Sequence, residues 1–226
     1  MVLSLKSMLD WAAYLIVIGY IFDVLDGVVA RFTGGGNKFG AELDNTADLI
    51  TYSIAPAVLA TAHYDQWTDA FGYYTLPVAA LVGLFPILFG TIRFARFNVK
   101  RIEYPGVWFG APRPATGLAI AAFLSSRIFA TDAGHWAGLA LIPALSVMNI
   151  ALWPVVGHHN RKFHPLVKLL LFVVAASCAA GAAFGFIWDV LIGWTTLYIF
   201  LSWLYVSPDE RGRIRAFVAS WRKSDG

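Results

Sequence analysis

Seven long apolar stretches constrain the fold of this chain more than any other feature of its sequence. A transmembrane helix needs about 20 mostly apolar residues. The stretches are continuous and do not alternate with a period of two, which favours helices over a membrane barrel. We therefore predict an all-α polytopic membrane protein, a bundle of about seven transmembrane helices. The predicted spans are Trp11–Arg31, Ala41–Ala62, Phe71–Ala95, Ala115–Ala130, Trp136–Val156, Leu166–Phe186 and Trp188–Val206.

The composition agrees with a membrane protein. Apolar residues make up 58% of the chain and charged residues 14%, whereas an ordinary soluble domain is about 25% charged. These values exclude a disordered chain and disfavour a soluble globular enzyme. The single cysteine, Cys178, forms no internal disulfide and no zinc site of the CxxC type.

The basic residues predict the orientation of the bundle. All but two of the 17 Lys and Arg residues lie in the segments 31–38, 93–113, 161–168 and 211–223. The connections at 63–72, at 130–135 and at Asp189 carry acids and almost no basic residues. The positive-inside rule places the basic set in the cytoplasm, so we expect an integral protein of the cytoplasmic membrane. Basic loops also account for the net charge of +3, and we expect no nucleic-acid partner.

The C-terminal segment differs from the rest of the chain. We expect residues 1–206 to form the transmembrane domain and residues 207–226 to form a basic cytoplasmic tail. Ile214, Phe217 and Val218 are spaced for one face of a helix. Two interpretations stay open, an amphipathic helix on an anionic membrane surface and a solvated tail that only sets topology.

Four carboxylates lie in or beside the first two predicted spans: Asp23, Asp26, Asp44 and Asp48. An isolated charge at the centre of a bilayer costs about 2.5–3.5 kcal/mol on the insertion scale. Four such charges require compensation by protonation, by basic partners or by metal ions. Intramembrane acids usually face a cavity and carry function.

The spacing places these acids on two facing helical stripes. Asp23 and Asp26 are three positions apart on one helix, and Asp44 and Asp48 are four apart on the next. A glycine-rich turn joins the two helices, so antiparallel packing would bring the carboxylates face to face. Hard oxygen ligands suit Mg²⁺, Mn²⁺ or Ca²⁺. Four carboxylates can hold two divalent ions, the arrangement that serves phosphoryl transfer.

Small residues share the same stripes. Gly27 and Ala30 follow Asp23 at the fourth and seventh positions, and Gly40 lies one turn before Asp44. Because Gly27 and Ala30 have almost no side chain, they leave room for a flat or bulky ligand near the backbone.

A longer pattern contains all of these residues. The string FDVLDGVVARFTGGGNKFGAELDNTAD fits D-x2-D-G-x2-A-R-x8-G-x3-D-x3-D at all eight fixed positions. This pattern resembles the signature of the CDP-alcohol phosphotransferases, and it is far more specific than a lone GxGxxG. The resemblance implies an enzyme that transfers a phosphoryl-linked group from a CDP-activated donor to an alcohol and releases CMP.

The resemblance implies roles for the matching acids. Asp23, Asp26 and Asp44 would hold two divalent cations, Mg²⁺ or Mn²⁺. Asp48 would contact one ion and act as the general base on the incoming alcohol. The acids lie at the predicted cytoplasmic ends of the first two spans, so the active site would face the cytoplasm.

The remaining matching positions would bind the nucleotide. Gly27 and Ala30 would make room for the cytidine nucleotide. Arg31 would lie near its phosphates, and Gly40 would allow close packing beside it.

Three further strings resemble the bacterial and archaeal phosphatidylserine synthases of this family: DNTADLITYSIAPA, TIRFARFNV and FGAPRPATG. This implies CDP-diacylglycerol or CDP-archaeol as the lipid donor and L-serine as the alcohol. Arginine binds carboxylates in bidentate fashion, so we expect Arg93 or Arg96 to hold the serine carboxylate. The alternative is that both arginines only mark the cytoplasmic side.

A second headgroup stays open. Thr51, Tyr52 and Ser53 stand where the serine enzymes more often show S-F-G, and this string also resembles bacterial phosphatidylcholine synthases. A choline site needs an aromatic cage, to which Tyr52, Tyr104 and Trp108 would contribute.

A different class of protein, a cation or proton transporter, also uses intramembrane acids. A transporter predicts acids spread over several spans and internal repeats, whereas these acids are concentrated on two neighbouring helices. Members of the resembling family usually carry another complete span before the first Asp pair, and only 22 residues precede Asp23. We therefore expect a family bundle without its first helix. The resemblance also implies a homodimer.

Overall fold

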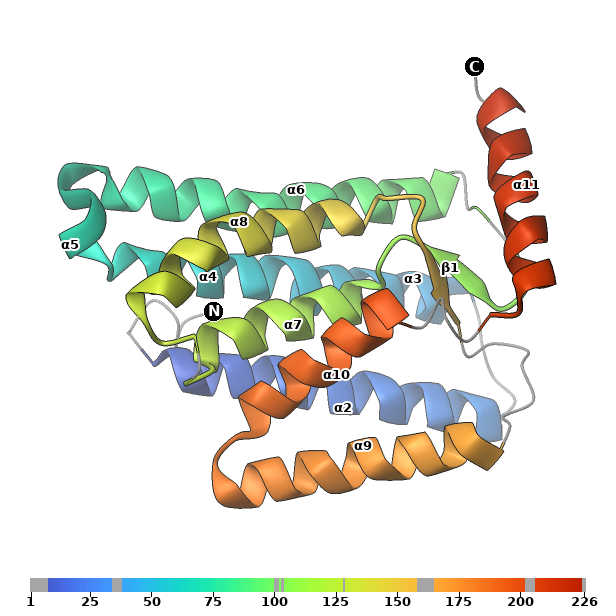
Figure 1. Cartoon of the computed structure of the whole chain (residues 1–226), viewed down its shortest axis with the longest axis horizontal. Coiled ribbons are helices and arrows are strands. Elements are labelled where there is room, and N and C mark those ends of the chain that lie inside the picture. Colours follow the sequence, from blue (N-terminus) through green and yellow to red (C-terminus); the bar gives the residue numbers. More distant parts are fainter. Residues whose placement is uncertain are drawn as a thin grey trace.

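Long helices run back and forth along one axis of the molecule (Figure 1). The computed structural model describes residues 8–33, 38–99, 102, 104–127, 129–157, 165–201 and 206–224. The helices longer than one turn are α2 (Leu9–Thr33), α3 (Lys38–Leu49), α4 (Ala55–Asp65), α6 (Thr75–Val99), α7 (Arg113–Ser125), α8 (Asp132–Met148), α9 (Pro165–Phe184), α10 (Ile187–Leu201) and α11 (Pro208–Ser224). Short elements are a π-helical turn η1 (Ile50–Ile54), α5 (Thr68–Phe71), a 3-10 turn η2 (Gly72–Tyr74), β1 (Val107–Phe109) and β2 (Pro154–Val156).

The second predicted span is one helix with a π-helical turn inside it. α3 passes through η1 into α4 without a break, and the amide of Ala55 donates to the carbonyl of Ile50. Pro56 at the start of α4 has no amide hydrogen, so the regular bond to the carbonyl of Tyr52 is lost. A wider turn accommodates this loss. The turn lies directly after Asp48 and sets the direction in which Tyr52 points.

Every predicted apolar span overlaps a helix, but some helices end earlier than predicted. The span Trp136–Val156 was expected to be helical throughout, whereas α8 ends at Met148. Asn149 explains the stop, because its backbone carbonyl accepts from Arg93 Nη1 at 2.6 Å. Its side-chain oxygen accepts from Thr116 Oγ1 at 3.1 Å. Hydrogen bonds from residues distant in the sequence thus replace the hydrogen bonds of a further helical turn.

A two-stranded ribbon lies beyond this stop, and the purely helical prediction missed it. β1 and β2 are antiparallel, with Val107 opposite Val156 and Phe109 opposite Pro154. Likewise α7 ends at Ser125, although its predicted span extended to Ala130. The C-terminal segment forms the helix α11, and both interpretations of this tail stay open.

α7 is the central helix of the bundle. Its residues from Ala115 to Leu124 are all buried, and it packs against α2, α4, α8 and α10. Ala and Gly dominate this helix, which lets its neighbours approach closely. The core cluster joins Ile16, Leu59, Ile120, Ile142 and Ile199 from five helices.

The connecting segments are sorted between the two ends of the bundle (Figure 1). The C-terminal end of α2, the N-terminal end of α3, the ribbon and α11 lie at one end. α5 and the first residues of α8 and α10 lie at the opposite end. Among the described residues, the basic segments therefore lie at one end of the bundle and the acidic connections lie at the other.

The outer helices expose apolar side chains. Among the described residues, Leu9–Val29 and Thr68–Val99 are long and apolar enough to cross a membrane. Phe22 on α2 and Leu81 on α6 are 66% and 59% exposed, and soluble monomers rarely carry large apolar patches of this kind. These features agree with an all-α membrane protein. The number of spans stays a prediction.

Candidate active site

Three of the four acids converge near the end of the bundle that carries the ribbon. One carboxylate oxygen from each of Asp23, Asp26 and Asp44 lies within 4.8 Å of the others. Asp23 and Asp26 are one turn apart on α2, and Asp44 faces them from α3. Asp23 is half-buried, whereas Asp26 and Asp44 are exposed. Three negative charges at this spacing repel one another, and a hard divalent cation is the ligand that such a donor set fits.

Asp48 lies one turn beyond Asp44 on α3 and contacts a basic side chain from α7. Arg113 Nη2 lies 3.4 Å from Asp48 Oδ2, and the two side chains are 8% and 20% exposed. From the sequence, Arg113 was only one of the basic residues that predict the orientation of the bundle, and it had no predicted role at the site. Its burial against the acid of the signature identifies it as part of the site.

Asn45 on α3 links this helix to α6 and α7 through hydrogen bonds. Arg113 Nη1 donates to the backbone carbonyl of Asn45 at 3.2 Å, and Arg113 Nη2 donates to Asn45 Oδ1. Asn45 Nδ2 donates to Asn98 Oδ1 on α6 at 2.8 Å. These three residues come from the strings DNTADLITYSIAPA, TIRFARFNV and FGAPRPATG. The three strings that resembled serine enzymes thus meet at one buried residue.

Tyr52 supports the carboxylate cluster. It is 2% exposed in the π-helical turn, and its hydroxyl donates to Asp23 Oδ2 at 3.1 Å. The sequence interpretation placed Tyr52 in a choline cage, and no spacing rule connects it to Asp23. The π-helical turn places the Tyr52 hydroxyl against Asp23. In the sequence, only Pro56 indicated an irregular helix there.

The two arginines near the end of α6 bond to backbone carbonyls. Arg93 is buried, and its Nη1 donates to Phe109 O at 3.1 Å and to Asn149 O at 2.6 Å. Arg96 donates to Ile150 O at 2.8 Å and to Phe109 O at 3.2 Å. Both side chains therefore connect α6 by hydrogen bonds to the ribbon and to the end of α8.

A glycine completes this junction. Gly110 directly follows β1 with a φ of +83°, and a Cβ there would lie 2.8 Å from Arg93 Nη1. Any larger residue would therefore meet both backbone strain and the arginine.

The proposed nucleotide positions lie around the acids. Gly27 follows Asp26 on α2 and is half-buried, and Gly40 is exposed near the start of α3. Ala30 and Arg31 belong to the last turns of α2, but their side chains lie outside the described residues.

The aromatic residues of the choline alternative are distributed over different contacts. Tyr52 contacts Tyr20 in addition to Asp23, with ring centroids 6.5 Å apart. Tyr104 packs against Phe217 of α11, with centroids 5.4 Å apart. Trp108 stacks on Phe97, with centroids 6.5 Å apart.

Known proteins resemble this chain. A family sequence model described as CDP-alcohol phosphatidyltransferase matches residues 1–144. A Helicobacter pylori protein named CDP-diacylglycerol–serine O-phosphatidyltransferase is 38% identical over 110 residues, 48% of this chain and 44% of that protein. A Methanocaldococcus jannaschii protein of the same name is 34% identical over 109 residues, 48% of each chain. A Mycobacterium tuberculosis protein of that name is 27% identical over 196 residues, 81% of this chain and 65% of that protein.

The matching segment spans about half the length of the first two relatives. The family match covers more than half of this chain and contains the acids of the signature and Arg113. The chain therefore belongs to the CDP-alcohol phosphatidyltransferase family.

Proposed function

We propose that this protein transfers the phosphatidyl group of CDP-diacylglycerol, or the lipid phosphoryl group of CDP-archaeol, to the hydroxyl of L-serine and releases CMP. The observation that carries this proposal is the convergence of Asp23, Asp26 and Asp44 within 4.8 Å, with Asp48 one turn further along α3. Family membership favours a transferase over the transporter alternative. The names of the three relatives support serine as the alcohol.

The four acids would hold two divalent cations, Mg²⁺ or Mn²⁺. When bound, these ions neutralise the negative charge of the pyrophosphate and of the leaving CMP, the main electrostatic need in phosphoryl transfer. Asp26 and Asp44 are exposed, so the cluster is accessible to a soluble nucleotide group. Gly27, Ala30, Arg31 and Gly40 would accommodate that group.

Asp48 would act as the general base. It takes the hydroxyl proton of serine while the hydroxyl oxygen bonds to the lipid-side phosphorus. The bond from this phosphorus to the bridging oxygen breaks, and CMP leaves with that oxygen. Arg113, 3.4 Å from Asp48 Oδ2, would hold the carboxylate in position, and Tyr52 would do the same for Asp23.

Arg93 and Arg96 stay the proposed partners of the serine carboxylate. An arginine carries five N–H donors. Within the described part of the chain, each of the two arginines donates to two backbone carbonyls, which leaves further donors for a ligand. The end of the bundle that holds these arginines and the acids also carries most of the basic segments. We therefore propose that the site faces the cytoplasm and that the protein lies in the cytoplasmic membrane.

A headgroup competition assay tests this function. Purified protein in detergent receives CDP-diacylglycerol, Mn²⁺ or Mg²⁺, and serine, choline, glycerol-3-phosphate or inositol in separate reactions, and CMP release is measured in each. We expect release with serine, and EDTA should abolish it because the carboxylates then lack their cations. The variant Asp48→Asn should fold normally and lose turnover.

Two results would overturn parts of the proposal. CMP release with choline alone would replace serine by the second headgroup and redirect mutagenesis to Tyr52, Tyr104 and Trp108. Full activity of Asp48→Asn would refute the assignment of the general base.

A further inference from the structure

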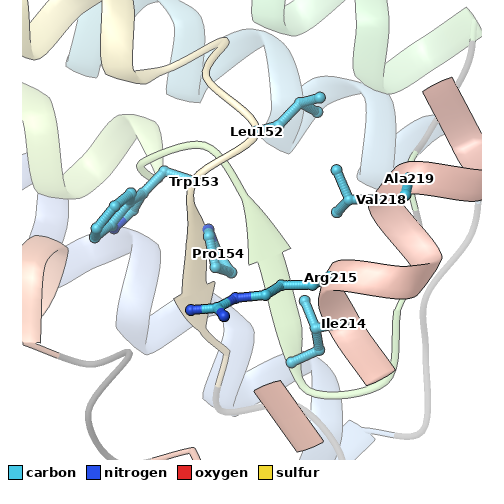
Figure 2. Close-up of a pocket in the computed structure, with 7 residues that line it drawn as sticks. All are labelled: Leu152, Trp153, Pro154, Ile214, Arg215, Val218 and Ala219. Atoms are coloured by element: carbon cyan, nitrogen blue, oxygen red, sulfur yellow. The ribbon is translucent and has the colours of Figure 1, made fainter. Parts of the chain in front are cut away.

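A cavity lies between α11 and the strand that follows α8, apart from the carboxylate cluster. Its volume is about 280 Å³, close to the lower end of the range for small-molecule sites. Leu152, Trp153 and Pro154 form one wall, and Ile214, Val218 and Ala219 of α11 form the other (Figure 2). The indole of Trp153 points away from α11, towards α10 (Figure 2). The lining is apolar apart from Arg215.

Both walls of this cavity are held in place. Trp153 Nε1 donates to the carbonyl of Ile199 on α10 at 3.0 Å, and Pro154 begins the strand that pairs with β1. Ile214 is 1% exposed and packs in a cluster with Val107 and Phe109 of β1. The cavity is therefore a preformed space between fixed elements.

The charged residue that lines the cavity is Arg215. Figure 2 shows the side chain of Arg215 extending from α11 across the cavity towards β2, and Arg213 is exposed on the same helix. The acids of α11, Asp209 and Glu210, lie in its first turn, before the residues that line the cavity. An apolar space beside an exposed guanidinium fits a ligand with an apolar chain and an anionic group.

The position of α11 indicates the source of that ligand. α11 lies across the end of the bundle, crosswise to the long helices and beside the ribbon (Figure 1). In a membrane protein this is the depth of the lipid headgroups, where basic residues meet anionic lipids and apolar surfaces meet acyl chains.

We propose that this cavity binds a phospholipid with an anionic headgroup. Its acyl chain would lie between Pro154 and Val218, and its phosphate would bond to Arg215. A lipid bound there would contact and stabilise β2. Its partner strand β1 accepts hydrogen bonds at Phe109 O from Arg93 and Arg96. The proposal does not depend on the headgroup specificity of the enzyme, so the two can fail separately.

Fluorescence quenching in nanodiscs tests the site. The full chain is placed in phosphatidylcholine discs with rising fractions of either phosphatidylglycerol or phosphatidylcholine that carries bromine on one acyl chain. Brominated chains quench tryptophan on contact, and the difference between Leu152→Trp and the unmodified chain isolates the signal of a reporter in the cavity wall. We expect half-maximal quenching by the phosphatidylglycerol at a roughly fivefold lower fraction than by the phosphatidylcholine, the advantage of about one basic residue near anionic lipid.

Matched variants identify the cause. Arg215→Gln should remove the preference for phosphatidylglycerol, whereas Arg213→Gln, also exposed but outside the cavity lining, should keep it. Ala219→Phe should fill the cavity and reduce quenching of the reporter at position 152 by both lipids. Equal midpoints for the two lipids at this reporter, equal losses in the two arginine variants, or undiminished quenching in Ala219→Phe would each overturn the proposal. Because both arginines are exposed, their replacement leaves the fold intact.

Discussion

At the scale of single residues, the acids of the signature depend on neighbours that the signature does not contain. Tyr52 donates to Asp23, and Arg113 bonds to both Asn45 and Asp48. Groups behind metal-binding or catalytic side chains fix the direction in which oxygen atoms point. Arg113 reaches 65 residues along the chain to do this for Asp48.

Tyr52→Phe should weaken metal binding without disturbing the bundle. Loss of the bond to Asp23 should raise the half-saturating Mn²⁺ concentration by about 10- to 100-fold, measured as free Mn²⁺ by electron paramagnetic resonance. Tyr64→Phe is the matched control, because Tyr64 is also buried and donates one bond, to the carbonyl of His135 at 2.9 Å. Both variants should lose about 1 kcal/mol of stability. An unchanged Mn²⁺ affinity in Tyr52→Phe would contradict the supporting role of the hydroxyl.

Arg113→Lys should reduce turnover more than substrate binding. Lysine keeps the positive charge but lacks the planar fork with which two guanidinium nitrogens reach Asn45 and Asp48, so the proposed base loses its orientation. We expect kcat for CMP release to fall about 10- to 100-fold with a small change in the KM for CDP-diacylglycerol. Arg127→Lys, an exposed arginine outside the site, is the control. Equal kcat values in the two variants would show that Arg113 does not position Asp48.

At the scale of elements, close packing of α4 against α6 sets the position of the site. α6 carries Arg93, Arg96 and Asn98, and α4 continues the helix of Asp44 and Asp48 through η1. Gly83 allows the approach, because a Cβ there would lie 2.7 Å from the carbonyl of Ala57 and even closer to Thr61 Oγ1. Small residues of this kind let membrane helices pack backbone to backbone.

Gly83→Ala should therefore destabilise the bundle. Overpacking of this type costs about 1–3 kcal/mol, which corresponds to a melting temperature lower by at least about 2 °C for a chain of this size. The measurement is thermal unfolding in detergent followed by circular dichroism. Gly193→Ala on α10 is the control, because a Cβ there meets nothing within 4 Å. Similar melting temperatures for the two variants would mean that α4 and α6 can separate without loss.

At the scale of the whole molecule, the two ends of the bundle differ in charge while its sides are apolar. The last turns of α6, which carry Arg93, the start of α7, which carries Arg113, and α11 lie at one end (Figure 1). α5 with Asp69 and the start of α8 with Asp132 lie at the other end. The exposed apolar faces of α2 and α6 can be covered by lipid or by a second copy of the chain. The homodimer that the family implies stays a prediction.

Cysteine labelling tests the proposed orientation. With Cys178 replaced by serine, the variants Asp69→Cys on α5 and Ser220→Cys on α11 each carry one exposed thiol. A membrane-impermeant maleimide added to intact cells should label the thiol at position 69 and reach position 220 only after permeabilisation, because the proposed orientation places the basic end in the cytoplasm. The reverse pattern would place the carboxylates outside and contradict the proposed site of serine entry.

The sequence alone determined the helical class, the approximate position of each apolar helix and the convergence of Asp23, Asp26 and Asp44. These features are local, because apolar length identifies a span and a spacing of three or four residues places Asp23 and Asp26 on one helical face. The segregation of Arg93 and Asp132 to opposite ends also followed from charge along the chain.

Only the tertiary structure decided the features that join distant residues. The stop of α8 at Met148 depends on Arg93 reaching Asn149, 56 positions away, and no local propensity contains that contact. The ribbon, the turn that aims Tyr52 at Asp23, and the meeting of Arg113 with Asp48 arise in the same way. Each requires a polar group in an apolar bundle to find a partner, and the partner available is fixed by how the helices pack.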